Sequence, residues 1–102
     1  MPQQEIQKQR TPKTRTIPKE PRNYRVIILN DDFTTFEFVV DVMVSIFMKS
    51  NEEAWVIAEK THIEKKATVG RYPPDIAKSK VAKATSLARA EGFPLSFEIH
   101  PE

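Results

Sequence analysis

The hydrophobic pattern of this chain begins at Tyr24 and predicts first a strand and then a helix. Residues 24–29 (YRVIIL) are rich in β-branched side chains and apolar enough for a buried strand. Thr34, with Glu37 three residues later, is typical of a capping box, and we expect a helix from about 35 to 49. Polar residues recur at every fourth position of this helix and form a narrow solvent stripe: Glu37, Asp41, Ser45 and Lys49. The remaining side chains are expected to form the central core: Phe36, Val39, Val40, Met43, Ile46 and Phe47.

The second half of the pattern predicts two more helices and two more strands. Residues 50–53 repeat the capping signal and start a helix over about 51–64, on which His62 points inward together with Ala58 and Thr61. Residues 67–72 suit a short strand. A third helix begins with prolines at 73–74 and is closed by Gly92. Residues 95–100 alternate between apolar and polar side chains, which is the period of a half-buried strand.

These elements follow the order β-α-α-β-α-β. The expected fold class is therefore α/β (α+β), a small sandwich of three helices against a three-stranded antiparallel sheet. A chain of 102 residues has room for one small domain with a modest core. A binding module is therefore favoured over a large enzyme.

The first 22 residues differ in composition from the rest of the chain. They hold six basic and two acidic residues and four of the eight prolines, whereas residues 23–102 hold ten basic and twelve acidic residues. Because this segment has few sizeable hydrophobic side chains, burying them cannot offset the conformational entropy that the segment would lose on folding. We therefore divide the chain into a disordered, basic, proline-rich extension (1–22) and a folded domain (23–102). The extension suits docking to nucleic acid or to an acidic protein surface, or is only a solvated leader.

The residue types that are scarce exclude several kinds of chemistry. Without cysteine there is no disulfide, thiolate zinc site or cysteine nucleophile, and a reducing compartment is favoured. Two glycines do not make a phosphate-binding loop. No stretch of about 18 apolar residues spans a bilayer, and the N-terminus lacks the apolar segment of a secretory signal. We expect a cytoplasmic protein with no membrane partner.

Three side chains with acceptor oxygens, Asn30, Asp31 and Asp32, separate the first strand from the first helix. Residues of this kind often only make turns, because they bond to nearby backbone N–H groups. Asp31, Asp32 and His62 are also the residue types of a metal site or an acid–base pair, which would make the chain a metal-assisted hydrolase. Both interpretations stay open at this point.

An ammonium ion suits these residues better than a metal does. A protonated amine presents three donors, and Asn30, Asp31 and a neutral His62 offer three acceptors. If the helix face with Ala58 and Thr61 packs beside the loop 30–36, an apolar hole forms next to these acceptors. The predicted guest is a charged amine attached to an apolar side chain.

The stretch YRVIILNDDFTTFEFVVDVM, followed by His62 and then by PPDIAKSKVAKATSLARAEGFPL, resembles the ClpS family over residues 23–101. ClpS proteins are adaptors of the bacterial N-end rule pathway. The resemblance implies a non-enzymatic adaptor without a cofactor, which binds a free N-terminal Leu, Phe, Tyr or Trp. It also implies delivery of the bound protein to the N-terminal domain of a Clp AAA+ unfoldase, of the ClpA or ClpC kind, and its peptidase.

The resemblance also assigns roles to individual residues. Asn30, Asp31 and His62 would hold the substrate α-amino group. The wall of the side-chain pocket would consist of Asp32, Thr34, Phe36, Val39, Ala58, Thr61 and Leu95. Asp75 and Lys80 match positions that contact the unfoldase, and the extension 1–22 matches a segment needed for substrate hand-over.

Four residues depart from the family pattern. Phe36 stands where methionine is frequent, Ala58 where a larger apolar residue is common, Thr61 where valine is usual, and Lys65 in a segment that usually carries glycine. These changes leave amine recognition intact but alter the shape of the pocket. They leave open which of the four N-terminal residues is preferred.

One alternative belongs to another class of protein. The element order and the basic extension also suit a nucleic-acid or ribosome-associated module. The resemblance favours the peptide-binding adaptor, for which we expect a monomer with no nucleic-acid partner.

Overall fold

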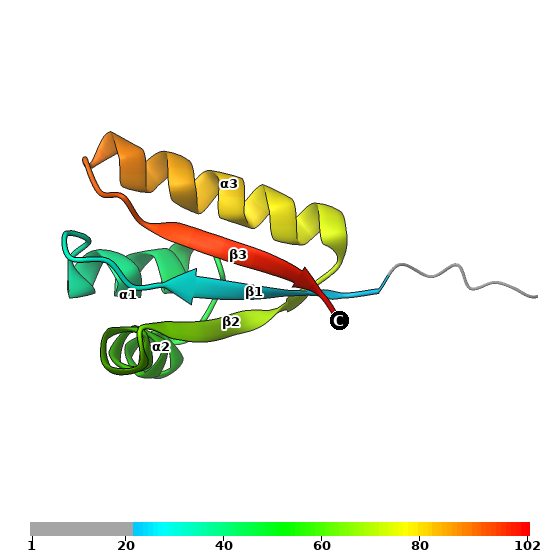
Figure 1. Cartoon of the computed structure of the whole chain (residues 1–102), viewed down its shortest axis with the longest axis horizontal. Helices are drawn as coiled ribbons and strands as arrows, with labels where there is room; N and C mark the ends of the chain where they lie inside the picture. Colours follow the sequence, from blue (N-terminus) through cyan, green and yellow to red (C-terminus); the bar gives the residue numbers. More distant parts are fainter. Residues whose placement is uncertain (1–21) are drawn as a thin grey trace, which may run out of the picture.

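The computed structural model describes residues 22–102, and its elements follow the predicted order (Figure 1). The elements are β1 (Tyr24–Leu29), α1 (Phe36–Ser45), α2 (Asn51–Glu64), β2 (Lys66–Tyr72), α3 (Pro74–Ala90) and β3 (Ser96–Pro101). The predicted fold class is confirmed. The proposed extension lies outside the described residues, except for Arg22.

The sheet has the strand order β2-β1-β3 with both pairs antiparallel, so β1 is central. Val26 and Ile28 of β1 are 0% exposed, and Ile28 lies opposite Ala67 of β2 and Phe97 of β3. The helices cover this apolar face. Figure 1 shows α3 alongside β3 and α2 beside β2, with α1 between them.

Small side chains let the helices approach the core closely. Ala54 and Ala58 of α2 and three alanines of α3 are buried: Ala77, Ala84 and Ala88. α2 begins with the predicted capping box, in which Ser50 and Glu53 bond reciprocally. Gly92 follows α3 with a φ of 81°, a left-handed conformation that glycine adopts without strain. No helix among residues 22–102 is long and apolar enough to cross a bilayer.

The first helix differs from its prediction at both ends. It ends at Ser45 rather than near 49, because Met48 adopts a φ of 58° and turns the chain away from the helix axis. At the start, Thr35 rather than Thr34 is the N-cap, and its side chain accepts a hydrogen bond from the Phe38 N–H. The Thr34 hydroxyl instead donates to Asp31 at 2.7 Å.

Lys80 of α3 is held by contacts within the fold. Its side chain is partly buried, and its ammonium donates to the Ile46 carbonyl at 2.8 Å. The same ammonium lies 5.7 Å from the centre of the Tyr72 ring. Lys80 therefore ties α3 to the C-terminal end of α1.

Candidate functional site

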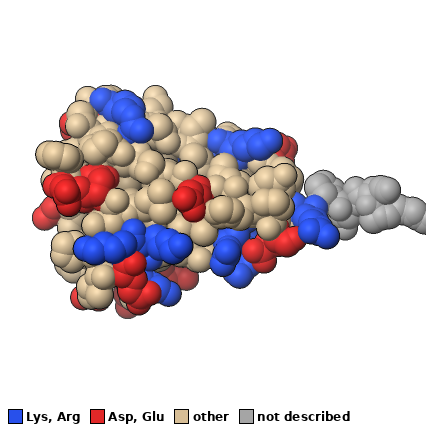
Figure 2. Space-filling view, viewed as in Figure 1, with Lys and Arg blue, Asp and Glu red and all other residues tan. Residues whose placement is uncertain are grey.

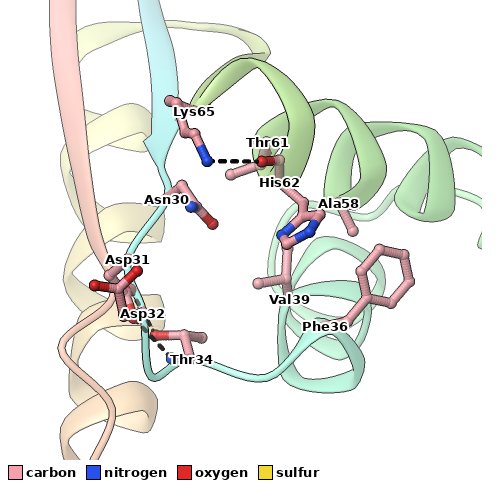
Figure 3. A pocket seen from close by; sticks show the side chains of 10 residues that line it. All are labelled: Asn30, Asp31, Asp32, Thr34, Phe36, Val39, Ala58, Thr61, His62 and Lys65. Carbon is pink, nitrogen blue, oxygen red and sulfur yellow. Dashed lines mark hydrogen bonds between the residues drawn. The ribbon is translucent and has the colours of Figure 1, made fainter.

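A cavity of about 390 Å³ opens between the loop that follows β1 and the helices α1 and α2 (Figure 3). One wall is polar and belongs to the loop, and the facing wall is built from the two helices. The lining residues are Asn30, Asp31, Asp32, Thr34, Phe36, Val39, Ala58, Thr61, His62 and Lys65. The structure thus brings together every predicted amine and pocket residue except Leu95.

A backbone hydrogen bond brings the two walls together. The Asn30 N–H donates to the Lys65 carbonyl at 2.9 Å, which joins the end of β1 to the end of α2. Lys65 is the C-cap of α2 and has a φ of 77°. Because this left-handed conformation turns the chain directly into β2, the last turn of α2 faces the loop.

Asp31 organises the polar wall. One of its carboxylate oxygens, Oδ1, accepts from the backbone N–H groups of Phe33 at 2.8 Å and Thr34 at 2.7 Å. The other, Oδ2, accepts from the Thr34 hydroxyl at 2.7 Å. A carboxylate has about four lone-pair sites, so these three bonds leave Oδ2 able to accept from one more donor. Asp31 therefore shapes the loop and still presents negative charge to the cavity.

The same contacts keep Asp31 ionised. Partial burial favours the neutral acid, but the donors from Thr34 and Phe33 and the positive charge of Arg89 outweigh it. The pKa of Asp31 is therefore lowered from its ordinary value of 3.8. At neutral pH the polar wall carries a fixed anion, which is the group that a cationic guest needs.

The opposite wall is apolar and well packed. Val39 of α1 and Ala58 and Thr61 of α2 are buried. The Thr61 hydroxyl donates to the Ile57 carbonyl at 2.7 Å, so this donor is already satisfied within the helix. Phe36, in the first turn of α1, closes one side of the cavity (Figure 3). An apolar side chain can therefore be enclosed next to the anionic loop.

The prediction that His62 points inward is wrong, because the residue is exposed. It follows buried Thr61 on α2, and one step along a helix turns a side chain by about 100°. Figure 3 shows its ring at the rim of the cavity, across from the Asn30 carboxamide. His62 is thus placed to meet a guest rather than to fill the core.

Leu95 does not line this cavity. It is 1% exposed and belongs to the core cluster, since it precedes β3 on the face that the helices cover. Asp75 and Lys80 lie on α3, apart from the cavity, where the Asp75 carboxylate accepts from the Ile76 N–H. The predicted contact of these two residues with an unfoldase stays a prediction.

Lys65 is the cavity residue that sequence reasoning missed. The sequence marks it only as a departure in a segment that usually carries glycine, whereas its side chain lines the cavity and its ammonium lies 3.5 Å from the His62 carbonyl. The positive charge of the Lys65 ammonium repels an ammonium guest in the cavity. Among residues 22–102, no three His, Cys, Asp or Glu side chains converge as a metal site would require.

Removing the charge of Lys65 is expected to strengthen binding of an amine. The substitution Lys65→Gln should tighten a Leu-starting peptide about two- to threefold, because like charges several ångströms apart repel even in water. The gain should shrink as salt is raised. Isothermal titration measures it, and Lys66→Gln is the matched control, because Lys66 lines a different cavity. An equal gain in both variants would mean that only net charge matters.

The backbone of Lys65 gives a separate readout. The variant Lys65→Gly removes the strain of a side chain at positive φ as well as the charge. Its free energy of unfolding should exceed that of Lys65→Gln by about 1 kcal/mol in urea denaturation. Equal stability of the two variants would contradict strain at this position.

Comparison with known proteins gives one consistent result. The family model for the ATP-dependent Clp protease adaptor protein ClpS matches residues 19–98. The Clp protease adapter protein ClpS of Treponema denticola is 49% identical over 80 residues, 78% of this chain and 79% of its own length. That of Nautilia profundicola is 47% identical over 75 residues, 74% of this chain and 77% of its own.

A solved structure shares the fold. Agrobacterium tumefaciens ClpS2 bound to L-phenylalaninamide superimposes with a TM-score of 0.78 at 37% sequence identity. The match covers 81% of this chain and 100% of that chain. The likeness therefore extends over most of this chain and the whole of that chain.

Proposed function

The chain belongs to the ClpS family of Clp protease adaptor proteins, and we propose that its loop–helix cavity binds the free N-terminal residue of proteins destined for degradation. The expected N-terminal residues are Leu, Phe, Tyr and Trp. Delivery then goes to a Clp AAA+ unfoldase, with the extension 1–22 assisting hand-over. Adaptor proteins of this family serve a protease, and the proposed role of this chain is binding rather than catalysis.

The observation that carries the proposal is the pairing of an anionic wall with an apolar one in a single cavity. An N-terminal residue has the matching composition, since an ammonium group with three donors sits one bond away from the carbon that bears the side chain. Asp31, Asn30 and His62 are the proposed acceptors for the ammonium. Phe36, Val39 and Ala58 are the proposed surroundings of the side chain.

The bound molecule of the structural relative agrees with this division. L-Phenylalaninamide, the molecule bound to ClpS2, combines a free amine with an aromatic side chain and has an amide in place of a carboxylate. It therefore has the chemistry of the first residue of a peptide. By analogy, we propose that the same chemistry is recognised here.

The polar and apolar walls contribute differently to binding. The ammonium is common to all N-termini, so its contacts supply affinity and exclude blocked or internal residues. The apolar wall distinguishes side chains by size and shape, because a closed pocket does not widen for a second group on Cβ without overpacking. Bulky residues branched beyond Cβ are therefore preferred over Val and Ile.

The nucleic-acid alternative gains no support from the described residues. On the face drawn in Figure 2, basic and acidic side chains are interspersed rather than gathered by sign. Residues 23–102 hold two more acidic than basic side chains. A continuous positive surface, which phosphate contacts require, is not present on this face.

The experiment that tests the function is a titration with matched peptides. The full chain is titrated with a fluorescent peptide that begins with Leu, with its N-acetylated twin, and with a version that begins with Ala. We expect acetylation to weaken binding at least about tenfold, because it removes the charge and all three donors. The Ala version should also be weaker, because it buries less apolar surface. Equal affinity of the first two peptides would contradict the proposal.

A further inference from the structure

A second, smaller groove lies directly beside the cavity. It has a volume of about 180 Å³ and runs between the outer face of α1 and the first half of α2. Its lining residues are Phe36, Glu37, Val40, Asp41 and Trp55. Phe36 lines both the groove and the cavity, so its side chain is the wall between them.

Trp55 is the feature that calls for an explanation. Its side chain is 57% exposed, which leaves much of a large apolar ring in contact with water. The ring centres of Trp55 and Phe36 are 4.6 Å apart, with the planes inclined by 59°. The contact fixes Phe36 from outside the cavity and leaves the rest of the Trp55 ring facing the groove.

We propose that this groove binds the side chain of a lysine or arginine at position two, three or four of a bound peptide, where the N-terminal residue in the cavity is position one. The inference rests on the proposed function, which supplies the peptide, and adds a second recognition site to it. A substrate would then be read at two points: a bulky N-terminal residue in the cavity and a basic residue in the groove.

The chemistry of the groove favours a cation with an apolar stem. Glu37 and Asp41 are exposed carboxylates one helical turn apart on α1, and both line the groove. Trp55 and Phe36 offer aromatic rings, which attract guanidinium and ammonium groups. Val40 lines the same groove and suits the methylene stem of such a side chain. An acidic side chain in the same place would meet two carboxylates.

The position of the groove sets which peptide residue reaches it. An extended chain advances about 3.3–3.6 Å per residue. A peptide whose first side chain occupies the cavity has only the Phe36 side chain to pass before it meets the groove. Residues two to four are therefore those in range.

The test compares peptides that differ in one charge. Each begins with Leu and carries Arg, Gln or Glu at position two, three or four, and fluorescence anisotropy gives its affinity for the full chain. We expect Arg to bind about fivefold more tightly than Gln at one of these positions, as for an exposed cation–π contact with carboxylates nearby. Glu at that position should bind more weakly than Gln.

Variants then locate the preference. Glu37→Gln, Asp41→Asn and Trp55→Ala should each reduce the Arg-to-Gln ratio to under about twofold. For each variant, the affinity of the Arg peptide is divided by that of the Gln peptide. A change in the position of Phe36 that weakens both peptides equally therefore leaves this Arg-to-Gln ratio unchanged. Glu98→Gln is the matched control, because Glu98 is an exposed carboxylate on β3, opposite Ile27 of β1, and lines neither cavity nor groove. It should keep the full ratio.

Two results would overturn the inference. A ratio near one at all three positions in the wild-type protein would mean that the groove reads no charge. A ratio that falls equally in Glu98→Gln and in Glu37→Gln would mean that only the net charge of the protein acts. Either result leaves the proposed function intact if the Leu peptide still binds and its acetylated twin does not, so the two failures are distinguishable.

Discussion

Replacing Asp31 by asparagine is expected to weaken binding of a Leu- or Phe-starting peptide by about tenfold to a hundredfold. Removing one partner of a desolvated charge pair costs about 2–5 kcal/mol, and the partial exposure of this site places the effect at the lower end. Asparagine keeps an oxygen that can accept from the Phe33 and Thr34 N–H groups, so the loop is retained while the charge is lost. Isothermal titration measures the change.

The control for Asp31→Asn is Glu98→Gln, which changes the net charge equally but lies outside the cavity. It should leave peptide affinity within about twofold of the wild type. If Asp31→Asn also stays within twofold while the protein remains folded, then Asp31 only shapes the loop. The site of the amine would then have to lie elsewhere.

Asp31 also makes folding stability depend on pH in a defined direction. Its pKa in the folded state is lowered below the ordinary 3.8, so the carboxylate favours the folded state above that pH. This contribution is lost as pH falls through the lowered pKa. The stability advantage of the wild type over Asp31→Asn should therefore be full near pH 6 and shrink below pH 4, as measured by urea denaturation at each pH.

The substitution Met43→Ala is expected to lower the free energy of unfolding by about 2–5 kcal/mol. Met43 of α1 is 0% exposed and lies in the core beneath the cavity-forming elements, so truncation removes buried surface and leaves a void. Met48→Ala is the matched control, because the same residue type there is 73% exposed. Its effect should stay within about 0.5 kcal/mol. Similar losses in the two variants would contradict the assignment of the core.

The sequence predicted the helices and strands well wherever a segment had a clear hydrophobic pattern or a clear start signal. β1 is apolar from Val26 to Leu29, and α2 and α3 carry local signals at their starts: a capping box and prolines. The end of α1 was missed because Ile46 and Phe47 continue the apolar pattern of the helix after its backbone has turned. A backbone turn at Met48, a residue with no preference for positive φ, leaves no trace in the pattern.

The sequence predicted most of the residues that line the cavity, but it did not predict the hydrogen bonds and side-chain orientations among them. Either Thr34 or Thr35 can cap α1, and only the tertiary bond between Thr34 and Asp31 decides between them. The orientation of His62 was missed because hydrophobic and polar residues are poorly separated on α2, so its buried face is hard to define. The pairing of Trp55 with Phe36 joins two helices across 19 positions of sequence, and no local pattern signals it.

Three of the residues that depart from the family pattern change the shape or the charge of the cavity. Phe36 and Trp55 together make one wall of the cavity rigid and aromatic, while Ala58 leaves space on the opposite helix. Lys65 adds a positive charge and a strained backbone where glycine would add neither. We therefore expect this chain to differ from its relatives in side-chain preference while it keeps the requirement for a free amine.

The measurement that tests the central claim most directly is a map of where an N-terminal residue binds. The ¹⁵N-labelled chain is titrated with L-phenylalaninamide and, separately, with its N-acetyl derivative, and the backbone amide shifts are followed by NMR. We predict that the free amine shifts the amides of residues 30–34 and 58–65 and that the acetylated compound leaves them nearly unchanged. Shifts confined to other elements, or identical shifts with both compounds, would contradict the claim that this cavity holds a free N-terminus.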